Sequence, residues 1–182
     1  MRPISTNASP RRPDPGPGAR GEIAIVDLGH AGEGVGRLDG LAVFVPGALP
    51  GDRVEVSLQE RRERYARARL ERILAPSPHR VEPPCPVADR CGGCPLQALA
   101  YPEQLAWKAR RVREALARIG GLDRSVVQPV LGMADPWGYR NKSQLPVAVL
   151  AGPGGRRVLM GFYRRGSHEI VDVDTCLVQH PL

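Results

Sequence analysis

The residues best suited to chemistry in this sequence are its four cysteines. Cys85, Cys91 and Cys94 lie within ten residues of one another, and Cys176 lies near the end of the chain. A Cys-x2-Cys pair lets two thiolates bind one metal ion or one edge of a cluster, and the glycines inside the pair free backbone amides to hydrogen-bond to sulfur. In a chain expected in the reducing cytoplasm, such cysteines indicate a metal rather than disulfides.

Two kinds of metal site suit four thiolates. Structural zinc sites use the same ligands, but they usually combine two short Cys-x2-Cys pairs. Three clustered cysteines completed by a distant fourth are more familiar from iron–sulfur proteins, in which four cysteines hold a [4Fe-4S] cluster. The spacing therefore favours the cluster over zinc, with buried thiols of no function as a third interpretation.

The composition indicates a basic chain rich in turns. Its 182 residues carry a net charge of +7, nearly all of the positive charge is arginine, and 21 glycines and 19 prolines accompany few aromatic residues. This predicts short strands rather than a helical bundle, in one ordinary domain or two small ones. Arginine suits RNA because it forks onto phosphate and stacks on bases, although a genome-wide preference for arginine explains the excess equally well.

The N-terminal half is predicted to hold a disordered tail and a small barrel. Residues 1–20 combine prolines with scattered arginines, which favours disorder. No apolar run reaches the ~20 residues that span a bilayer and no signal peptide is evident, so we expect a cytoplasmic protein. Residues 21–75 alternate apolar and polar residues as β-strands do. The expected strands are 22–28, 41–45, 52–58 and 61–74, with a glycine-rich turn at 30–36.

Arginines in two segments are candidates for RNA binding. On a strand, Tyr65, Arg67 and Arg69 would share one face, and an arginine ladder beside an aromatic residue suits single-stranded RNA. The alternative is a solvated edge whose charge prevents aggregation. In the second segment, basic residues follow two aromatic ones and could contact phosphate or a base edge, the alternative being a turn stabilised by its Asn and by salt bridges. The candidates are Arg61, Arg62, Arg64, Tyr65, Arg67, Arg69, Arg140, Asn141 and Lys142.

The C-terminal half is predicted to combine one helix with an antiparallel sheet. Residues 102–119 form an amphipathic pattern with an apolar stripe, which would be left uncovered if a further domain normally packs on it. Strands at 143–150, 158–163 and 169–173 are expected to lead Cys176 back to the other three cysteines. The expected fold class is therefore mainly β or α+β: a small β-barrel over 21–75, then an α+β segment over 76–182 that binds the metal.

Parts of the sequence resemble two known families. The sequence Gly34-Val-Gly-Arg-Leu-Asp-Gly40, followed by Val43-Phe-Val-Pro-Gly-Ala-Leu-Pro-Gly-Asp52, is similar to the TRAM domain, an OB-like barrel attached to RNA-modifying enzymes. Three further stretches together resemble the RNA uracil-5-methyltransferases. They are the Cys-x5-Cys-Gly-Gly-Cys group, the segment Trp137–Lys142 and the segment Gly161–Cys176. Enzymes of that family make 5-methyluridine in ribosomal and transfer RNA.

The second resemblance implies a role for the cysteines and a limit on activity. It implies that all four bind a [4Fe-4S] cluster and that RNA is the partner. S-adenosylmethionine (SAM) and the catalytic cysteine of that family belong to a Rossmann-like domain, and this sequence has no strand–glycine loop–helix unit and no spare thiol. We therefore expect the chain not to transfer a methyl group by itself, and we assign no catalytic or SAM-binding residue. The alternative is a stand-alone iron–sulfur or zinc protein that binds RNA without catalysis.

Overall fold

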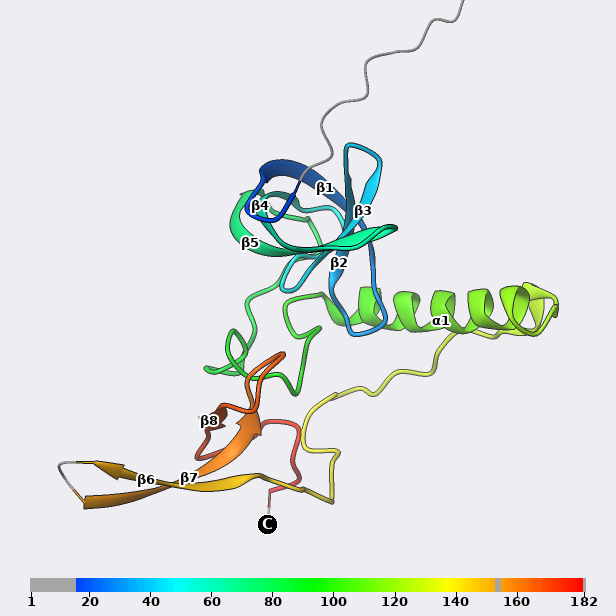
Figure 1. Cartoon of the computed structure of the whole chain (residues 1–182). Coiled ribbons are helices and arrows are strands. Elements are labelled where there is room, and N and C mark those ends of the chain that lie inside the picture. The colour runs from blue at the N-terminus through cyan, green and yellow to red at the C-terminus, as the bar shows by residue number, and fades with distance from the viewer. Residues whose placement is uncertain (1–15, 153–154, 182) are drawn as a thin grey trace, which may run out of the picture. The chain divides into compact units, whose positions relative to one another are not determined.

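The computed structural model describes residues 16–152 and 155–181 (Figure 1). By its internal contacts the chain divides into two compact units, with the division after Ser77. The first unit is built of strands, and the second combines a helix with a small sheet. In the part of the chain that is described, no helix combines the length and the apolar character that a membrane crossing requires.

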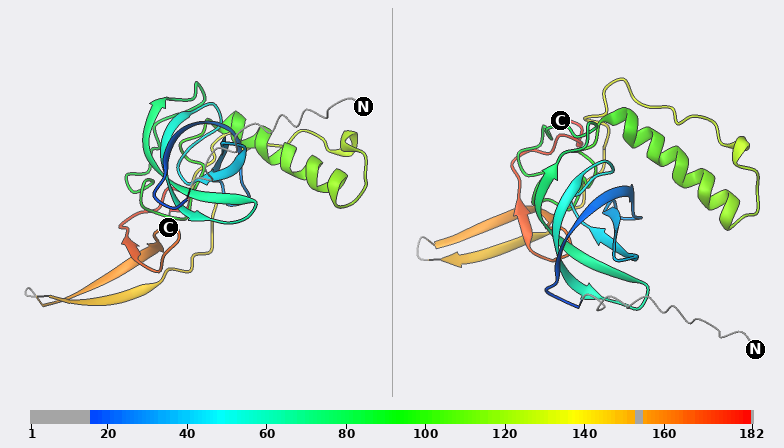
Figure 2. Two further views of the ribbon diagram at one scale, coloured as in Figure 1. Left: turned by 45° about the horizontal axis from the view of Figure 1, so that its top comes forward. Right: turned by 90° about the horizontal axis from the view of Figure 1, so that it is seen from above.

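The first unit is a closed five-stranded barrel. Around it the strand order is β1-β2-β3-β5-β4, and β4 pairs with β1 to close the ring. The pairings are antiparallel except between β3 and β5, which run parallel. Its strands are β1 (Arg20–Leu28), β2 (Gly34–Leu38), β3 (Leu41–Val45), β4 (Arg53–Arg61) and β5 (Tyr65–Ala75). The predicted OB-like barrel is confirmed, and Figure 2 shows it from two further sides.

The barrel core follows from period-two alternation along the strands. Val54, Val56 and Leu58 alternate on β4 and are at most 1% exposed, as the pattern predicts. On β5, Ala66 and Ala68 turn inward while the arginines between them face outward. Because small alanines fill the inner face of this long strand, the barrel can close tightly around its valines and isoleucines.

The glycine-rich segment was predicted as a turn, and this is wrong for its second half. Gly34 and Gly36 lie on β2 and face the interior. A Cβ on Gly34 would lie 2.7 Å from the carbonyl oxygen of Ala48, and one on Gly36 would lie 2.6 Å from that of Ala24. These glycines therefore allow backbones to approach inside a small barrel, and the composition alone does not distinguish that role from a turn.

Two predicted boundaries also need correction. Arg61 is the last residue of β4 rather than the first of the next strand, and residues 62–64 form the turn between β4 and β5. Of the predicted disordered tail, residues 1–15 lie outside the described part of the chain. Residues 16–20 are ordered: the amide of Gly18 donates to the carbonyl of Leu58 at 2.8 Å, and Arg20 begins β1.

The second unit contains one long helix and a three-stranded antiparallel sheet. The sheet has the order β6-β7-β8. The helix predicted over 102–119 is confirmed: Pro102 lies in its first turn, and Gly121, with a φ of 64°, follows its end. The elements are α1 (Tyr101–Arg118), the short 3-10 helix η1 (Arg124–Val126), β6 (Val147–Gly152), β7 (Gly155–Tyr163) and β8 (Ile170–Asp172).

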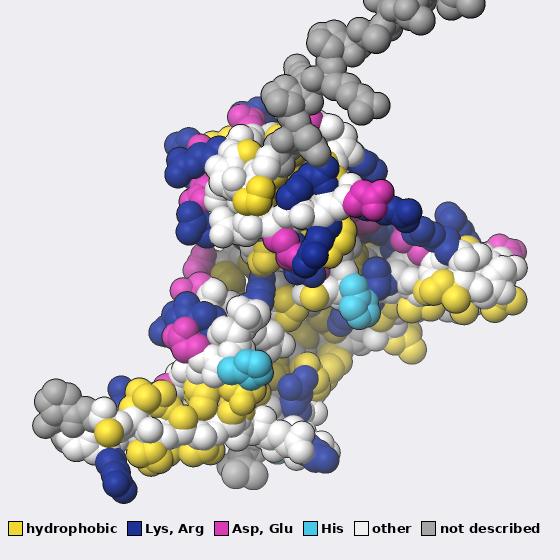
Figure 3. Space-filling view, viewed as in Figure 1, with side chains coloured by type: hydrophobic (Ala, Val, Ile, Leu, Met, Phe, Trp, Pro, Cys, Tyr) yellow, Lys and Arg dark blue, Asp and Glu magenta, His cyan; other side chains and the backbone are white. Residues whose placement is uncertain are grey.

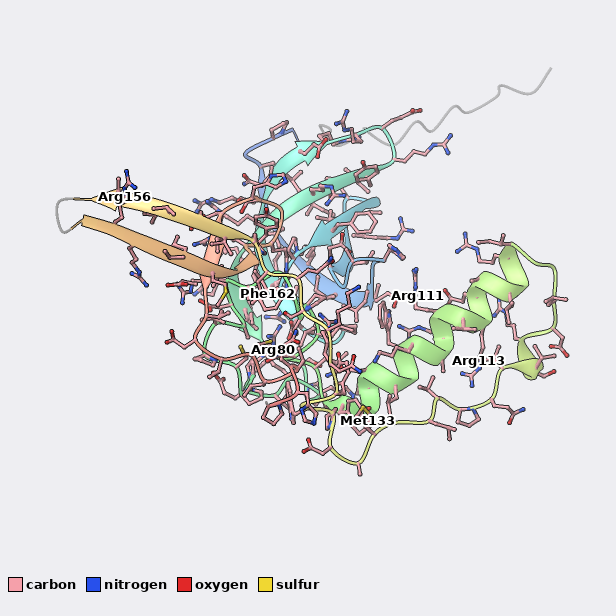
Figure 4. The ribbon with its side chains drawn as sticks, turned by 90° about the horizontal axis from the view of Figure 1, so that it is seen from below. Arg80, Arg111, Arg113, Met133, Arg156 and Phe162 are labelled. Atoms are coloured by element: carbon pink, nitrogen blue, oxygen red, sulfur yellow. The ribbon has the colours of Figure 1, made fainter. Side chains whose placement is uncertain are left out.

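The apolar stripe of α1 is only partly covered. The chain that follows α1 returns beside it: Arg113 donates to the carbonyl of Val127 at 3.4 Å, and the amide of Met133 donates to the hydroxyl of Tyr101 at 2.9 Å. Figure 4 shows Arg113 between the helix and this returning segment. Val112 and Ile119 nevertheless stay 49% and 88% exposed, so the distal part of the stripe faces solvent in this structure.

The β6–β7 hairpin also exposes an apolar face. Val147 pairs with Met160 and Val149 pairs with Val158, so these four side chains lie on one face of the ribbon. All four are at least 48% exposed. Figure 3 shows hydrophobic side chains gathered along this hairpin.

Candidate functional site

The four cysteines line one pocket of the second unit. Cys85, Cys91, Cys94 and Cys176 are each half-buried, and Phe162 of β7 forms part of the same wall. The sequence predicted that the C-terminal strands return the last cysteine to the other three, and this placement is confirmed. The donors are four thiols with no carboxylate among the lining residues, a set that suits zinc or an iron–sulfur cluster.

Tight turns and one strand position the first three cysteines. The amide of Cys91 donates to the carbonyl of Val87 at 2.8 Å, which folds the five residues between Cys85 and Cys91 into a compact loop. The amide of Gly92 then donates to the carbonyl of Tyr163 at 2.9 Å, joining the loop to the end of β7. A Cβ on Gly92 would lie 2.9 Å from that same oxygen, so the position requires glycine.

Sulfur also receives a backbone hydrogen bond, as the glycines predicted. The amide of Gly93 donates to Sγ of Cys91 at 3.4 Å. Such bonds stabilise a thiolate ligand and tune the group that it binds. The pair of glycines therefore has two separate uses, close approach to β7 at one residue and a donor for sulfur at the next.

The thiols are close enough to affect one another electrostatically. Burial raises the pKa of the Cys94 thiol, and the neighbouring Cys176, Cys91 and Cys85 raise it further, whereas a hydrogen bond with Gln97 lowers it. Like charges placed together disfavour ionisation of each, so four thiolates here need a cation to balance them.

The pocket between the thiols is small. Among the described residues, no group of three or more His, Cys, Asp or Glu side chains is arranged to hold a metal ion. The cavity between the cysteines has a volume of about 20 Å³. The fit to a metal group therefore rests on the identity and the grouping of the donors.

On the barrel, the predicted arginine ladder lies on the outer face of β5. Tyr65, Arg67 and Arg69 alternate with buried alanines, so they share the outer face as expected. The ring of Tyr65 meets the ring of Phe44 on β3 edge to face, with centroids 5.7 Å apart. Phe44 was missed by the sequence reasoning, because only the parallel pairing of β3 with β5 brings it beside the ladder.

Glutamates accompany most of these arginines. Arg69 pairs with Glu71 at 2.8 Å, whereas Arg67 reaches Glu33 and Glu60 only at 3.9 Å. A hydrogen bond from Ser57, followed by that from Arg69, lowers the pKa of the Glu71 carboxyl. Exposed pairs of this kind are weak, and phosphate can compete for the same guanidinium groups.

The other candidates of this group lie close to the β4–β5 turn. Arg62 pairs with Glu60 there, Arg64 is exposed in the turn itself, and Arg61 ends β4.

The second basic segment lies in the other unit, beside the cysteines. Arg140 lines the thiol pocket, and Asn141 and Lys142 follow it as exposed residues. The backbone of Arg140 pairs with the chain just after Cys176, forming a parallel bridge with Gln179. Its position next to the thiols was not apparent from the sequence, because 35 residues separate Arg140 from Cys176.

Comparison with known proteins identifies the barrel. A family model described as TRAM domain matches residues 17–70, nearly all of the closed barrel. Residues 17–70 form a TRAM domain. The match covers the arginine ladder up to Leu70 and ends before the cysteines begin, so it describes the first unit alone.

Relatives extend over both units. An uncharacterized RNA methyltransferase of Caldanaerobacter subterraneus subsp. tengcongensis is 50% identical over 165 residues, 91% of this chain and 35% of that protein. An uncharacterized RNA methyltransferase of Halalkalibacterium halodurans is 43% identical over 159 residues, 87% of this chain and 34% of that protein. The chain thus spans about a third of the length of the relatives it matches.

Two solved structures are also similar. The Pyrococcus abyssi tRNA (uracil-54, C5)-methyltransferase, in complex with S-adenosyl-L-homocysteine, has a TM-score of 0.48 and 27% identity, over 87% of this chain and 33% of that one. A conserved protein of Methanococcus maripaludis has a TM-score of 0.31 and 30% identity, over 38% of this chain and all of that one.

Proposed function

We propose that this chain is the RNA-recognition and [4Fe-4S]-binding portion of a cytoplasmic, SAM-dependent RNA uracil-5-methyltransferase that acts on 23S ribosomal RNA or transfer RNA. One observation carries the proposal: a TRAM barrel precedes a pocket of four thiols in a chain that aligns over 91% of its length with a protein named RNA methyltransferase. The chain's own residues would bind and orient RNA, and SAM chemistry would belong to the remainder of the enzyme.

The spacing of the cysteines favours a cluster over zinc. Four ligands of one zinc ion must converge on a single point, whereas in a [4Fe-4S] cluster each thiolate binds a different iron atom. Structural zinc sites usually combine two Cys-x2-Cys pairs, whereas here three clustered cysteines share a pocket with a distant fourth, a grouping more familiar from iron–sulfur proteins. When bound, the cluster would supply the positive charge of its core and four bonds to sulfur, three to the loop at 85–94 and one to Cys176 after β8.

Two exposed apolar surfaces support a larger enzyme over a stand-alone RNA-binding protein. The distal stripe of α1 and one face of the β6–β7 hairpin both present aliphatic side chains to solvent. A two-stranded ribbon with an exposed apolar face is marginal by itself and gains stability by packing against a further element. A further domain of the same enzyme is the partner that these surfaces fit.

RNA binding is tested by removing the two exposed arginines of the ladder. Replacing Arg67 and Arg69 by Ala should weaken binding to a labelled single-stranded RNA of 20 nucleotides. A plot of the logarithm of the association constant against the logarithm of the salt concentration should also become less steep. Its slope should fall in magnitude by about 1.4, about 0.7 for each phosphate group that is no longer neutralised. Fluorescence anisotropy at several salt concentrations measures both.

A matched pair of arginines on the same barrel serves as the control. Arg53→Ala with Arg72→Ala removes the same net charge from residues that pair with Glu22 and Glu55. Equal reductions in affinity in the two double variants would indicate a general charge effect. They would contradict a specific role of Arg67 and Arg69 in RNA binding.

The cluster is tested by anaerobic purification followed by iron, sulfide and zinc analysis. About four irons and four sulfides per chain are expected for a [4Fe-4S] cluster. Zinc without iron or sulfide would overturn the cluster and leave a zinc-bearing RNA-binding protein as the better proposal.

A further inference from the structure

A short ladder of backbone hydrogen bonds joins the second basic segment to the chain after the fourth cysteine. Its three bonds, each 2.9 Å long, run from Gly138 N to Leu177 O, from Arg140 N to Val178 O and from His180 N to Arg140 O. The ladder begins at the residue after Cys176. The fourth thiol and the basic segment therefore belong to one local structure, although they are far apart in sequence.

The strip of chain that carries the ladder, residues 173–180, is held on both sides of Cys176. Upstream, the amide of Val173 donates to the carbonyl of Met160 at 3.1 Å and ties the strip to β7. Downstream, Val178 is 6% exposed and provides the apolar anchor. Cys176 lies half-buried between these two anchors, so a bond from its sulfur to a metal would fix the stretch that carries the ladder.

The basic segment that this ladder of backbone hydrogen bonds holds carries side chains that suit RNA. Arg140, Asn141 and Lys142 are all exposed, and among the described residues none of them pairs with a carboxylate. Two cations and an amide on consecutive residues can reach phosphate oxygens and a base edge. Gly138 has a φ of 61°, a conformation that favours glycine and turns the chain into this display.

We propose that RNA binding by Arg140, Asn141 and Lys142 depends on ligation of Cys176. The inference rests on the proposed function, since it takes both the metal group and RNA as given. Ligation fixes Cys176, the fixed strip holds the ladder, and the ladder holds the basic segment in one conformation. Without ligation the segment gains conformational freedom, and each RNA-binding event then includes the cost of ordering it.

The test measures RNA affinity of the full chain with and without the cluster. The probe is the same labelled 20-nucleotide single-stranded RNA, and the cluster is removed by anaerobic chelation and verified by iron and sulfide analysis. Removal should weaken wild-type binding about tenfold, the effect of ordering about one backbone residue. The slope of log K against log salt should stay the same, because the segment, once ordered in the complex, neutralises the same phosphate groups.

Two variants show where the effect originates. The variant with Arg140→Gln, Asn141→Ala and Lys142→Gln should bind RNA equally with and without the cluster. The barrel variant with Arg67→Ala and Arg69→Ala should keep the full tenfold response, since its changes lie in the other unit. Hydrogen exchange at the amides of Gly138, Arg140 and His180 should accelerate on cluster removal, while exchange in the barrel stays unchanged.

Each failure has its own pattern. Wild-type protein that holds the cluster and binds RNA equally with and without it would overturn this inference and leave the proposed function standing. A triple variant whose affinity falls on cluster removal as much as that of wild type would also overturn it, because the response would then come from elsewhere in the second unit. A chain with no iron and sulfide, or with no RNA binding, would overturn the proposed function and the inference together.

Discussion

The two units of this chain have different sources of stability. The barrel encloses an apolar core in which Val43, Val45, Val54 and Val56 are fully buried. Within residues 78–152 and 155–181 of the second unit, the buried apolar side chains are Leu99, Ala109, Val171 and Val178. A unit with so little core needs another means of holding its loops together, and the four grouped thiols offer one. A binding surface on the barrel is therefore preformed, whereas one beside the cysteines depends on what they bind.

The largest effect expected from this comparison is at Cys176. Cys176→Ser removes one of four metal ligands; a complete structural zinc site contributes on the order of 10 kcal/mol to a small domain, and loss of one ligand should forfeit part of a contribution of this kind. The second unit of the reconstituted variant should melt at a lower temperature, and the barrel should keep its own transition. Differential scanning calorimetry separates the two transitions. Thr175→Ser, at the exposed neighbouring residue, should leave both in place; an unchanged melting temperature in Cys176→Ser would contradict the prediction.

A substitution in the core of the barrel tests the stability of the first unit. Leu58 is 1% exposed, so Leu58→Ala leaves a cavity and should destabilise the barrel by about 2–5 kcal/mol. The second unit should keep its own transition, because its stability has a different source. Urea unfolding followed by hydrogen exchange in each unit measures this. Val26→Ala, at a residue 70% exposed on the same barrel, should change stability by less than about 0.5 kcal/mol.

A smaller effect is expected from a buried carboxylate of the barrel. Asp52 is 1% exposed, and its two oxygens accept from the amides of Leu49 at 2.7 Å and Ser77 at 2.8 Å. Asp52→Asn leaves one amide without an acceptor and should cost about 1–3 kcal/mol. Glu63→Gln in the exposed turn makes the same chemical change and is expected to be silent. Similar unfolding midpoints for the two variants would show that the Asp52 contacts contribute little.

The smallest effect expected is a pH dependence confined to the β7–β8 pair. The amide of Met160, and then the guanidinium of Arg157, lower the pKa of the Asp172 carboxyl. Because the folded pKa lies below the unfolded one, the stabilisation is complete above the ordinary carboxyl pKa of about 4 and is lost as the pH falls through the folded value. NMR titration should find the Asp172 pKa depressed in wild type and closer to ordinary in Arg157→Gln. An ordinary pKa in wild type would refute this.

Periodicity and spacing were enough to predict most of the architecture. Alternation in Asp52–Leu58 and in Tyr65–Leu70 predicted strands with a shared inner face, because a strand's side chains point to opposite sides in turn. The grouping of Cys85, Cys91 and Cys94 with a lone Cys176 predicted a shared site, which the pocket confirms as a placement. The metal group and the RNA contacts stay predictions.

Tertiary structure alone decided which residues stand beside which. Gly34 and Gly36 are the same residue type that makes turns, and only the approach of Ala48 and Ala24 shows that they serve a strand. Phe44 contacts Tyr65 because β3 and β5 pair in parallel, and no local sequence pattern predicts this pairing. Arg140 meets the chain after Cys176 through backbone hydrogen bonds, which depend on no side-chain type and so leave no signal in sequence. The sequence by itself therefore determined the strands, the helix and the four thiol donors. The tertiary structure determined which of these residues become neighbours.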